Sequence, residues 1–223
     1  MVKQPLFLDN DGLRDSIVEM FYQNSPFRVE HIAKKILETD GVENFRMVED
    51  TSNSVFLQNE LYRIQIRPDC ISFNNIKKYQ RWPNYSQLIL KVIRSVLSLG
   101  EITFDRQMIR YISMYPNVSI FDNLNGKKME LNAVPPIDGT EIRFKMGIAD
   151  NDNHLGLATI RLTDNLPSNK PSIKVSVVDI QIDATTSNDN LESTIEFLHR
   201  EERNLFFSLL NKKFIDSLGA HYE

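Results

Sequence analysis

The chain has 223 residues, of which 41% are hydrophobic and 25% are charged, and its net charge is −4. This composition is ordinary for a globular protein that buries a sizeable core, and the negative charge disfavours general adhesion to nucleic acid or anionic lipid. The single cysteine, Cys70, excludes an internal disulfide and a cysteine-based zinc cluster, and no apolar run has the length of a membrane span or a signal peptide. We therefore expect a cytoplasmic protein without a membrane partner.

The first third of the chain alternates between strand and helix patterns. A helix is expected to begin near Pro26, where proline loses no hydrogen bond, and to end at Gly41. Apolar and polar residues then alternate on both sides of Pro68-Asp69, which predicts a hairpin whose exposed face carries Arg63 and Arg67. The predicted strands span 17–22, 45–48, 55–57, 62–67 and 70–74.

The stretch from Tyr79 to Tyr115 is the most strongly patterned part of the chain. An aromatic group around Trp82 precedes an apolar stripe with helical spacing. This spacing predicts a helix over 85–99, with Asn84 as its N-cap and Gly100 as its C-terminal stop.

A strand with an unusual face is expected directly after this helix. Its period of two places Ile102 and Phe104 on the same face as Arg106 and Arg110, with Tyr111 on the other face. An apolar face that becomes basic indicates a strand that leaves the core toward solvent or toward an anionic ligand. Solvated or salt-bridged arginines are the commoner of the two arrangements.

Residues 116–137 are the least regular part of the sequence. Asn125-Gly126 favours a tight turn, because both residues tolerate a positive φ. The segment is expected to form either a small hairpin, between 120–121 and 129–131, or a connection between lobes. Long ordered connections often bind ligands or partners, so this segment is a second candidate site.

A hairpin is predicted in the second half of the chain. Apolar and polar residues alternate over 142–148 and again over 155–162, and a polar turn separates the two runs. Arg143 and Lys145 occupy the polar face of the first of these strands.

The turn of this hairpin resembles a calcium loop only in part. Asp150 and Asp152 have the spacing of two calcium ligands. His154, Leu155 and Arg161 stand where such a loop requires an oxygen ligand, a glycine and a bidentate glutamate. We therefore expect a polar turn and no metal.

The strand over 173–182 changes its apolar face partway, which indicates a bulge or burial on both faces. Its polar residues Asp179, Gln181 and Asp183 point together, as a metal site or an acid/base pair would require. No histidine or third carboxylate is near them in sequence, so solvation on an edge strand is the better interpretation.

A long helix is expected from about 191 to 218, after a segment rich in capping residues. His199 is expected on its surface, beside charged residues. The wide apolar stripe of this helix is a candidate surface for a partner helix or a second copy. The interface residues of this stripe are Phe206, Phe207, Leu210 and Phe214.

Several of these patterns occur together in a known family. Tyr79-x-x-Trp82, the helix after it and Arg106-x-x-x-Arg110-Tyr111-Ile112 resemble the central signature of a sporadically distributed, uncharacterised family of prokaryotic proteins. The segment with Leu198-His199 resembles it too, so the likeness covers about 79–218, although Ser113 stands where the family has asparagine. The resemblance implies no activity. The family's patchy distribution implies an accessory role in a mobile bacterial system such as defence.

Together the patterns predict an α+β fold, in which a mostly antiparallel sheet of hairpins packs against three main helices, with a long C-terminal helix. We expect a single domain over 1–223, or two lobes over about 1–115 and 138–223 that the irregular segment 116–137 joins.

The sequence contains no phosphate loop, no dinucleotide-binding loop, no serine-hydrolase motif and no zinc-protease motif. We therefore expect a non-catalytic interaction protein that needs no cofactor and docks another protein or a second copy of itself. One alternative is recognition of a nucleic acid or nucleotide by a basic sheet face, and another is an enzyme that uses carboxylates alone. The basic face would consist of Arg63, Arg67, Arg106, Arg110, Arg143 and Lys145.

Overall fold

The structure is a computed structural model, which describes residues 4–23, 25–42, 44–51, 53–77, 79, 81–126, 138–167 and 173–222. The hairpin expected at 129–131 lies outside these residues. The described helices are α1 (Val29–Leu37), α2 (Trp82–Leu97), the 3-10 turn η1 (Phe121–Asn123), α3 (Leu191–Leu209) and α4 (Lys212–Ser217). The described strands are β1 (Phe7–Leu8), β2 (Leu13–Gln23), β3 (Arg46–Thr51), β4 (Ser54–Gln58), β5 (Tyr62–Arg67), β6 (Cys70–Asn75), β7 (Thr103–Pro116), β8 (Glu141–Ala149), β9 (Leu155–Pro167), β10 (Lys174–Thr185) and β11 (Ala220–His221).

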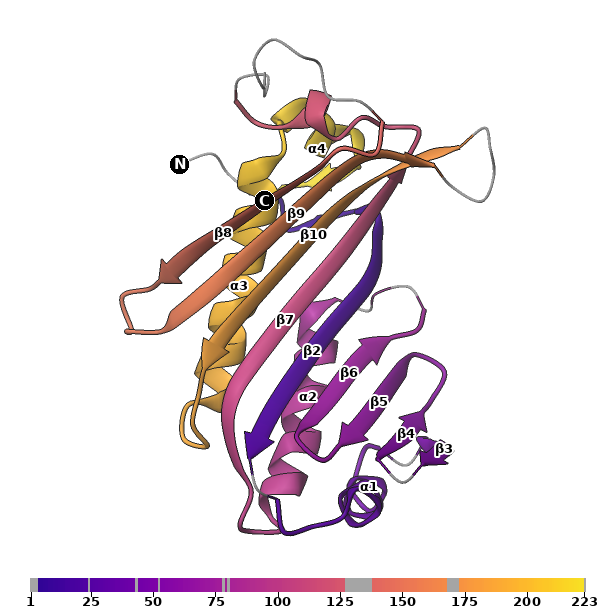
Figure 1. Ribbon diagram of the computed structural model, residues 1–223, viewed down its shortest axis with the longest axis vertical. Helices are drawn as coiled ribbons and strands as arrows, with labels where there is room; N and C mark the ends of the chain where they lie inside the picture. The colour runs from indigo at the N-terminus through magenta and orange to yellow at the C-terminus, as the bar shows by residue number, and fades with distance from the viewer. Residues whose placement is uncertain are drawn as a thin grey trace.

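A nine-stranded antiparallel sheet forms the centre of the molecule (Figure 1). Its strand order is β3-β4-β5-β6-β2-β7-β10-β9-β8, and β1 and β11 pair separately. This arrangement confirms the predicted α+β class with its mostly antiparallel sheet and its C-terminal helix. The stretches 1–115 and 138–223 both contribute strands to the one sheet.

The two halves of the sheet follow one topological plan. In the first half, the central strand β2 is followed by α1, by the strands β4, β5 and β6 from the edge inwards, and by α2. In the second half, the central strand β7 is followed by η1, by β8, β9 and β10 from the opposite edge inwards, and by α3. Because β2 and β7 pair antiparallel at the centre, an approximate twofold axis relates the halves. Among the described strands of the sheet, only β3 has no counterpart.

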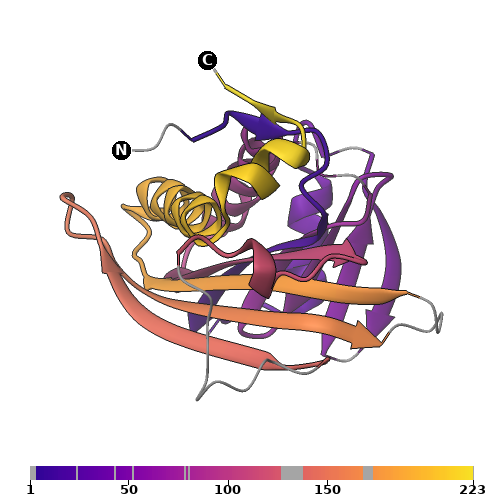
Figure 2. The ribbon, with the colours of Figure 1, turned by 90° about the horizontal axis from the view of Figure 1, so that it is seen from above.

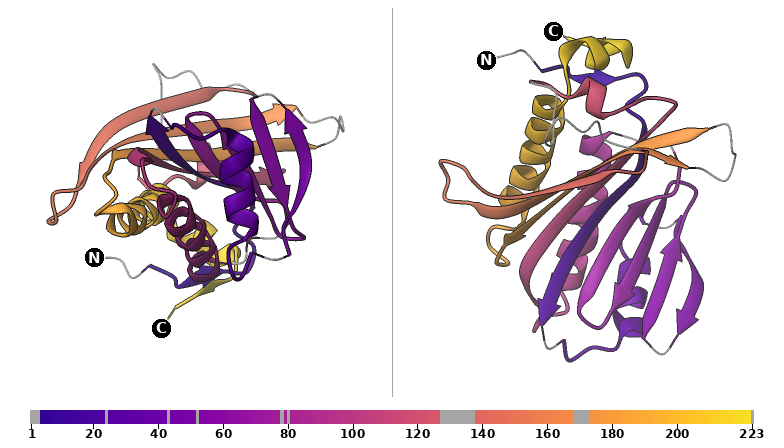
Figure 3. Two further views of the ribbon diagram at one scale, coloured as in Figure 1. Left: turned by 90° about the horizontal axis from the view of Figure 1, so that it is seen from below. Right: turned by 45° about the horizontal axis from the view of Figure 1, so that its top comes forward.

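The long helices cover one face of the sheet, here called the helix face. Figure 2 shows α2 and α3 lying inside the curve of the sheet, and Figure 3 shows α1 beside them under the first half. The strands turn their apolar residues toward this face, and the paired residues Val18 and Ile109 are both fully buried there. Within the described residues, no helix lies on the other face, here called the open face.

A bulge in β7 separates its apolar residues from its basic residues. Phe104 lies opposite Tyr22, whereas Arg106 lies opposite Phe21, so Asp105 is an extra residue in β7. Phe104 is therefore buried on the helix face. The Arg106 guanidinium lies on the open face, 3.7 Å from the centre of the Phe21 ring. The prediction that Phe104 and Arg106 share a face was wrong, because the extra residue shifts the alternation.

The apolar residues of β10 occupy both faces of the sheet. Its pairing with β7 is continuous from Val175 to Thr185, so Val175 and Val177 lie half-buried on the open face, whereas Val178 is buried on the helix face. Of the two predicted explanations, burial on both faces is therefore the one observed. The bulge lies in the neighbouring strand β9, since Val175 lies opposite Leu166 but Val177 lies opposite Thr163. In the sheet, β10 lies between β7 and β9. The expected edge-strand position of Asp179 and Asp183 was therefore wrong.

Two helix boundaries differ from those predicted. The helix α2 begins at Trp82 rather than at 85, since Pro83 in the first turn needs no hydrogen-bond partner. The C-terminal helix does not continue to 218, because Leu210 is extended and bridges Leu124. A new helix, α4, starts after Asn211, whose side chain accepts a 2.9 Å hydrogen bond from the Phe214 amide.

The assignment of the two faces can be tested by truncating one side chain on each. Ile180 in β10 is 1% exposed on the helix face, and Ile180→Ala is expected to lower the free energy of unfolding by about 2–5 kcal/mol through cavity formation. Met114 in β7 is 38% exposed on the open face, so Met114→Ala is expected to cost only about 0.5 kcal/mol. Urea denaturation followed by circular dichroism measures both values. Equal losses would contradict the assignment.

Candidate functional site

All six basic residues of the predicted basic face lie on the open face of the sheet. The strand pairing places three of them, Arg63, Arg110 and Lys145, in one transverse row across seven strands. Six strand spacings of about 4.8 Å separate the two ends of this row by at most about 29 Å. The row consists of Arg63, Asn74, Ile17, Arg110, Gln181, Thr159 and Lys145.

Carboxylates neutralise much of this positive charge. Arg110 binds Asp179 with two hydrogen bonds, of 2.9 and 2.8 Å, and the Asp179 side chain is only 8% exposed. Arg161 approaches the same carboxylate at 3.8 Å and the Glu141 carboxylate at 3.7 Å. Arg143 also lies 3.4 Å from Glu141. An ion-pair network therefore crosses β7, β10, β9 and β8.

Two further arginines of the predicted face are paired in the same way. Arg106 lies 3.3 Å from Asp183, and Arg67 lies 2.8 Å from Glu19. The Asp179 and Asp183 carboxylates thus serve as partners of arginines rather than as a metal site. Arg63 instead donates two hydrogen bonds to the neutral Gln58 amide, and no ion pair to Lys145 occurs within the described part of the chain.

The free edge of β8 is the second feature of interest. Among the described strands β8 pairs only with β9, and seven of its nine residues are exposed. Its register with β9 is continuous from Glu141 to Ala149, so its outer backbone groups form an uninterrupted edge. In Figure 2, β8 forms the rim of the curved sheet.

The side chains of β8 alternate between two chemical types. Phe144 and Met146 lie opposite the buried Ile160 and Ala158, so they point to the helix face, yet they are 37% and 44% exposed. Arg143 and Lys145 point to the open face. Strand alternation identified these faces in the sequence, but the edge position of β8 was not recognised because strand order is a property of the whole fold.

The other edge of the sheet is protected. The strand β3 has six residues, and a register shift between Met47 and Glu49 interrupts its pairing with β4. Short edge strands, charges and bulges are the usual means by which proteins prevent unwanted strand pairing. Met47 and Val48 are nevertheless 42% and 44% exposed on β3. The two edges thus expose similar apolar groups but differ in regularity.

A buried polar cluster lies between α2, α3 and β7. The Tyr79 and Tyr111 hydroxyls are hydrogen-bonded at 2.9 Å, and the Tyr111 hydroxyl lies 3.3 Å from Nδ1 of His199. The His199 ring stacks on Trp82 with the ring centres 4.1 Å apart, and Trp82 Nε1 donates to the Glu196 carboxylate. His199 is only 9% exposed, so its predicted surface position was wrong. The fold thus brings together residues from separate motifs of the family resemblance.

Burial shifts the protonation of two groups near this cluster. Burial raises the pKa of the Glu202 carboxyl to about 8 and lowers the pKa of the His199 imidazole to about 3, the latter with a contribution from the Arg203 charge. Shifts of this size are common in active sites. Here, however, Glu202 is 3% exposed and His199 is 9% exposed, so a substrate cannot reach either group. The cluster therefore supports packing rather than catalysis.

The buried Glu202 predicts a pH dependence of stability. The folded protein retains a proton on Glu202 up to about pH 8, whereas the unfolded chain releases it above its ordinary pKa of 4.5. The free energy of unfolding is expected to fall between about pH 6.5 and 8, with a slope of at most about 1.4 kcal/mol per pH unit from this group. Below about pH 6.5 the slope from His199 has the opposite sign, because only the unfolded chain binds that proton.

Urea denaturation at several pH values tests this expectation. In Glu202→Gln the fall between about pH 6.5 and 8 is expected to disappear. The control Glu192→Gln changes an exposed residue that pairs with Arg94 on the surface, and it is expected to retain the fall. Parallel pH profiles for the wild type and Glu202→Gln would show that Glu202 titrates normally.

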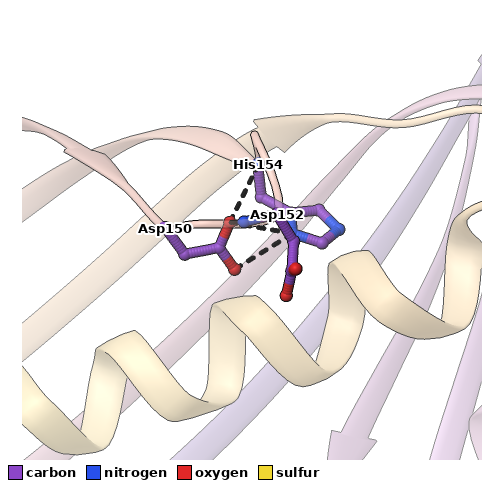
Figure 4. A group of neighbouring side chains, drawn as sticks. All are labelled: Asp150, Asp152 and His154. Atoms are coloured by element: carbon purple, nitrogen blue, oxygen red, sulfur yellow. Dashed lines mark hydrogen bonds and ion pairs between the residues drawn. The ribbon is translucent and has the colours of Figure 1, made fainter.

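The turn between β8 and β9 brings Asp150, Asp152 and His154 together (Figure 4). Asp150 accepts hydrogen bonds from the backbone amides of Asp152 and His154, and the Arg200 guanidinium lies 2.7 Å from it. Desolvation raises the pKa of the Asp150 carboxyl, but these hydrogen bonds outweigh it and lower that pKa to about 2. The guanidinium of Arg200, a residue of α3, already balances the negative charge of Asp150. The three residues therefore form a polar hairpin tip that contacts α3.

Three of the four residues predicted as a partner interface lie inside the molecule. Phe206, Leu210 and Phe214 are 9%, 1% and 7% exposed, and they belong to the hydrophobic core. Phe207 is half-buried, with the Arg203 guanidinium 5.2 Å from its ring centre. In this structure the aromatic stripe of α3 and α4 therefore packs against the sheet and presents little surface to a partner.

Comparison with known protein families and curated proteins gives no match. No protein-family model matches the chain, and no curated protein matches it. None of the helices in the described ranges is long and apolar enough to span a membrane.

Proposed function

We propose that this protein is a non-catalytic interaction protein that docks a partner by adding a strand of the partner to the free edge of β8. The observation that carries the proposal is the nine-residue edge, which is regular and largely exposed. Edge strands with unpaired backbone groups bind extended segments through main-chain hydrogen bonds, and alternate side chains supply specificity. The exposed Phe144 and Met146 supply apolar contacts for such a segment.

Two other features favour binding over catalysis. Glu202 and His199, whose pKa values are strongly shifted, are enclosed in the core and inaccessible to a substrate. The surface depressions beside α1 and beside the ends of β3 and β4 have volumes of about 480 and 400 Å³, and neither contains these groups. The β8 edge is thus the exposed feature with the clearest means of recognition.

The double variant Phe144→Lys/Met146→Lys tests the proposal, because charges that point inward from an edge strand prevent strand pairing. A protein captured from a host lysate by the wild type is expected to be lost with this variant. The matched control Met47→Lys/Val48→Lys places the same charges on the other edge, at residues of similar exposure. It is expected to capture the partner as the wild type does.

Circular dichroism and thermal unfolding establish that both variants are folded before capture. Quantitative mass spectrometry then compares the bound proteins. A partner retained equally by all three proteins would show that docking uses another surface.

The second candidate function is binding of nucleic acid through the open face. The observation that favours it is the single row that contains Arg63, Arg110 and Lys145. The pairing of Arg110 with Asp179 weakens it, because a phosphate would have to displace a bidentate carboxylate.

Retention on a DNA column at increasing salt measures this activity. Since Arg63 and Lys145 have no ionic partner among the described residues, the double variant Arg63→Gln/Lys145→Gln is expected to elute at lower salt if phosphates are bound. Lys213→Gln, on α4, is the control. Elution of the wild type with the void volume at about 50 mM salt would exclude this function.

A further inference from the structure

We infer that the segment that pairs with β8 is an extended stretch in which apolar residues alternate with aspartate or glutamate. This inference rests on the proposed function and specifies its partner. It follows from the charges, the apolar side chains and the internal symmetry of the sheet.

The open-face side of the β8 edge is positively charged, although the chain as a whole is negative. Arg143 and Lys145 lie on this side of β8, and Arg161 of β9 lies directly opposite Arg143. The single carboxylate of β8, Glu141, already contacts both Arg143 and Arg161. Acidic residues on an added strand would therefore meet unbalanced positive charge.

The helix-face side of the edge is apolar at every position. Ile142, Phe144, Met146 and Ile148 point there, since each lies opposite a residue of β9 that faces the helices or opposite Gly156. Cross-strand pairs of apolar residues stabilise a sheet, as do pairs of opposite charge. A partner strand in register would thus place apolar residues against this row and acidic residues against Arg143 and Lys145. Gly147 leaves open space beside these two positions for longer acidic side chains.

The first half of the sheet shows where such a strand is added. By the approximate twofold axis, β4 corresponds to β8, and β3 pairs with β4 in the position that no described strand occupies beside β8. The strand β3 is antiparallel to β4. The same topological plan therefore already accepts one antiparallel strand in this position.

A second copy of β8 fits this edge poorly. If two β8 strands overlapped fully in antiparallel orientation, Lys145 would face Lys145 of the other copy, and two Arg143 side chains would add to the same patch. Like charges directly opposite each other destabilise a strand pair. The charges thus favour a different, acidic strand.

Two synthetic nine-residue peptides test the inference directly. Both alternate isoleucine with a charged residue, which is glutamate in one and lysine in the other, and fluorescence anisotropy at about 50 mM salt measures their affinity. The glutamate peptide is expected to bind about tenfold tighter, since two cross-strand ion pairs contribute. Arg143→Glu/Lys145→Glu is expected to reverse the preference. Hydrogen exchange is expected to show protection of amides in 141–149 on binding.

The possible outcomes separate the inference from the function on which it rests. Equal affinity for both peptides, or preference for lysine, would overturn the acidic specificity, even if Phe144→Lys/Met146→Lys still abolished partner capture. Binding of the glutamate peptide that this double variant leaves unchanged would place the peptide elsewhere and overturn the inference too.

A disulfide test addresses the second copy as occupant. The native Cys70 is buried, so in Lys145→Cys the introduced thiol is the one that an oxidant can reach. If two β8 strands paired fully, the two introduced cysteines would lie opposite each other within disulfide range. We expect no disulfide dimer on oxidation. Efficient dimer formation by Lys145→Cys but not by Glu141→Cys would overturn the inference in favour of self-pairing.

Discussion

The antiparallel pairing of β2 with β7 is the contact on which the rest of the structure depends. These strands join the two halves of the nine-stranded sheet, and each is the first strand of its half in that sheet. Their helix-face residues, such as Val18 and Ile109, are fully buried beneath the helices. Burial of such side chains contributes about 1.5–3 kcal/mol each, so the central pair stabilises both halves at once. The other described strands of the nine-stranded sheet lie outward from this pair.

The nine-stranded sheet has two edge strands, and they differ in length and regularity. The first edge ends in β3, which is short and interrupted by a register shift. The second ends in β8, which is longer and regular. Both edges carry charged residues, which oppose unwanted strand pairing, but only β3 is also short and interrupted. This difference in regularity is the reason why our proposal uses the edge of β8 rather than that of β3.

The sequence predicted those features that depend on neighbours in the chain. The hairpin around Pro68-Asp69 was confirmed, because its alternation and its turn are both local. The prediction that Arg106 shares a face with Phe104 was wrong, because the bulge at Asp105 is defined only by pairing with Phe21 and Tyr22 of β2. The burial of His199 was missed for the same reason, since Trp82, which covers it, comes from another helix.

The candidate site shows the same limit. Alternation in the sequence assigned Arg143 and Lys145 to one face of their strand, and the structure agrees with that local assignment. The partners Asp179 and Glu141, which decide how much of the basic charge is free, lie on strands whose adjacency no local pattern specifies. Nor does any local pattern show that β8 is at the rim.

The electrostatics of the sheet are the reason why we propose recognition at the rim rather than at the centre of the open face. At the centre, Asp179 is nearly buried and both of its oxygens bind Arg110, so an incoming anion must break two charge-assisted hydrogen bonds in a partly desolvated site. At the rim, Lys145 is exposed and the backbone of β8 is unpaired on its outer side within the described structure. A partner there would gain main-chain hydrogen bonds and a charge pair with Lys145, for which the described residues supply no ion pair. The ion pairs that occupy the arginines of the open face therefore favour the edge strand as the proposed binding site.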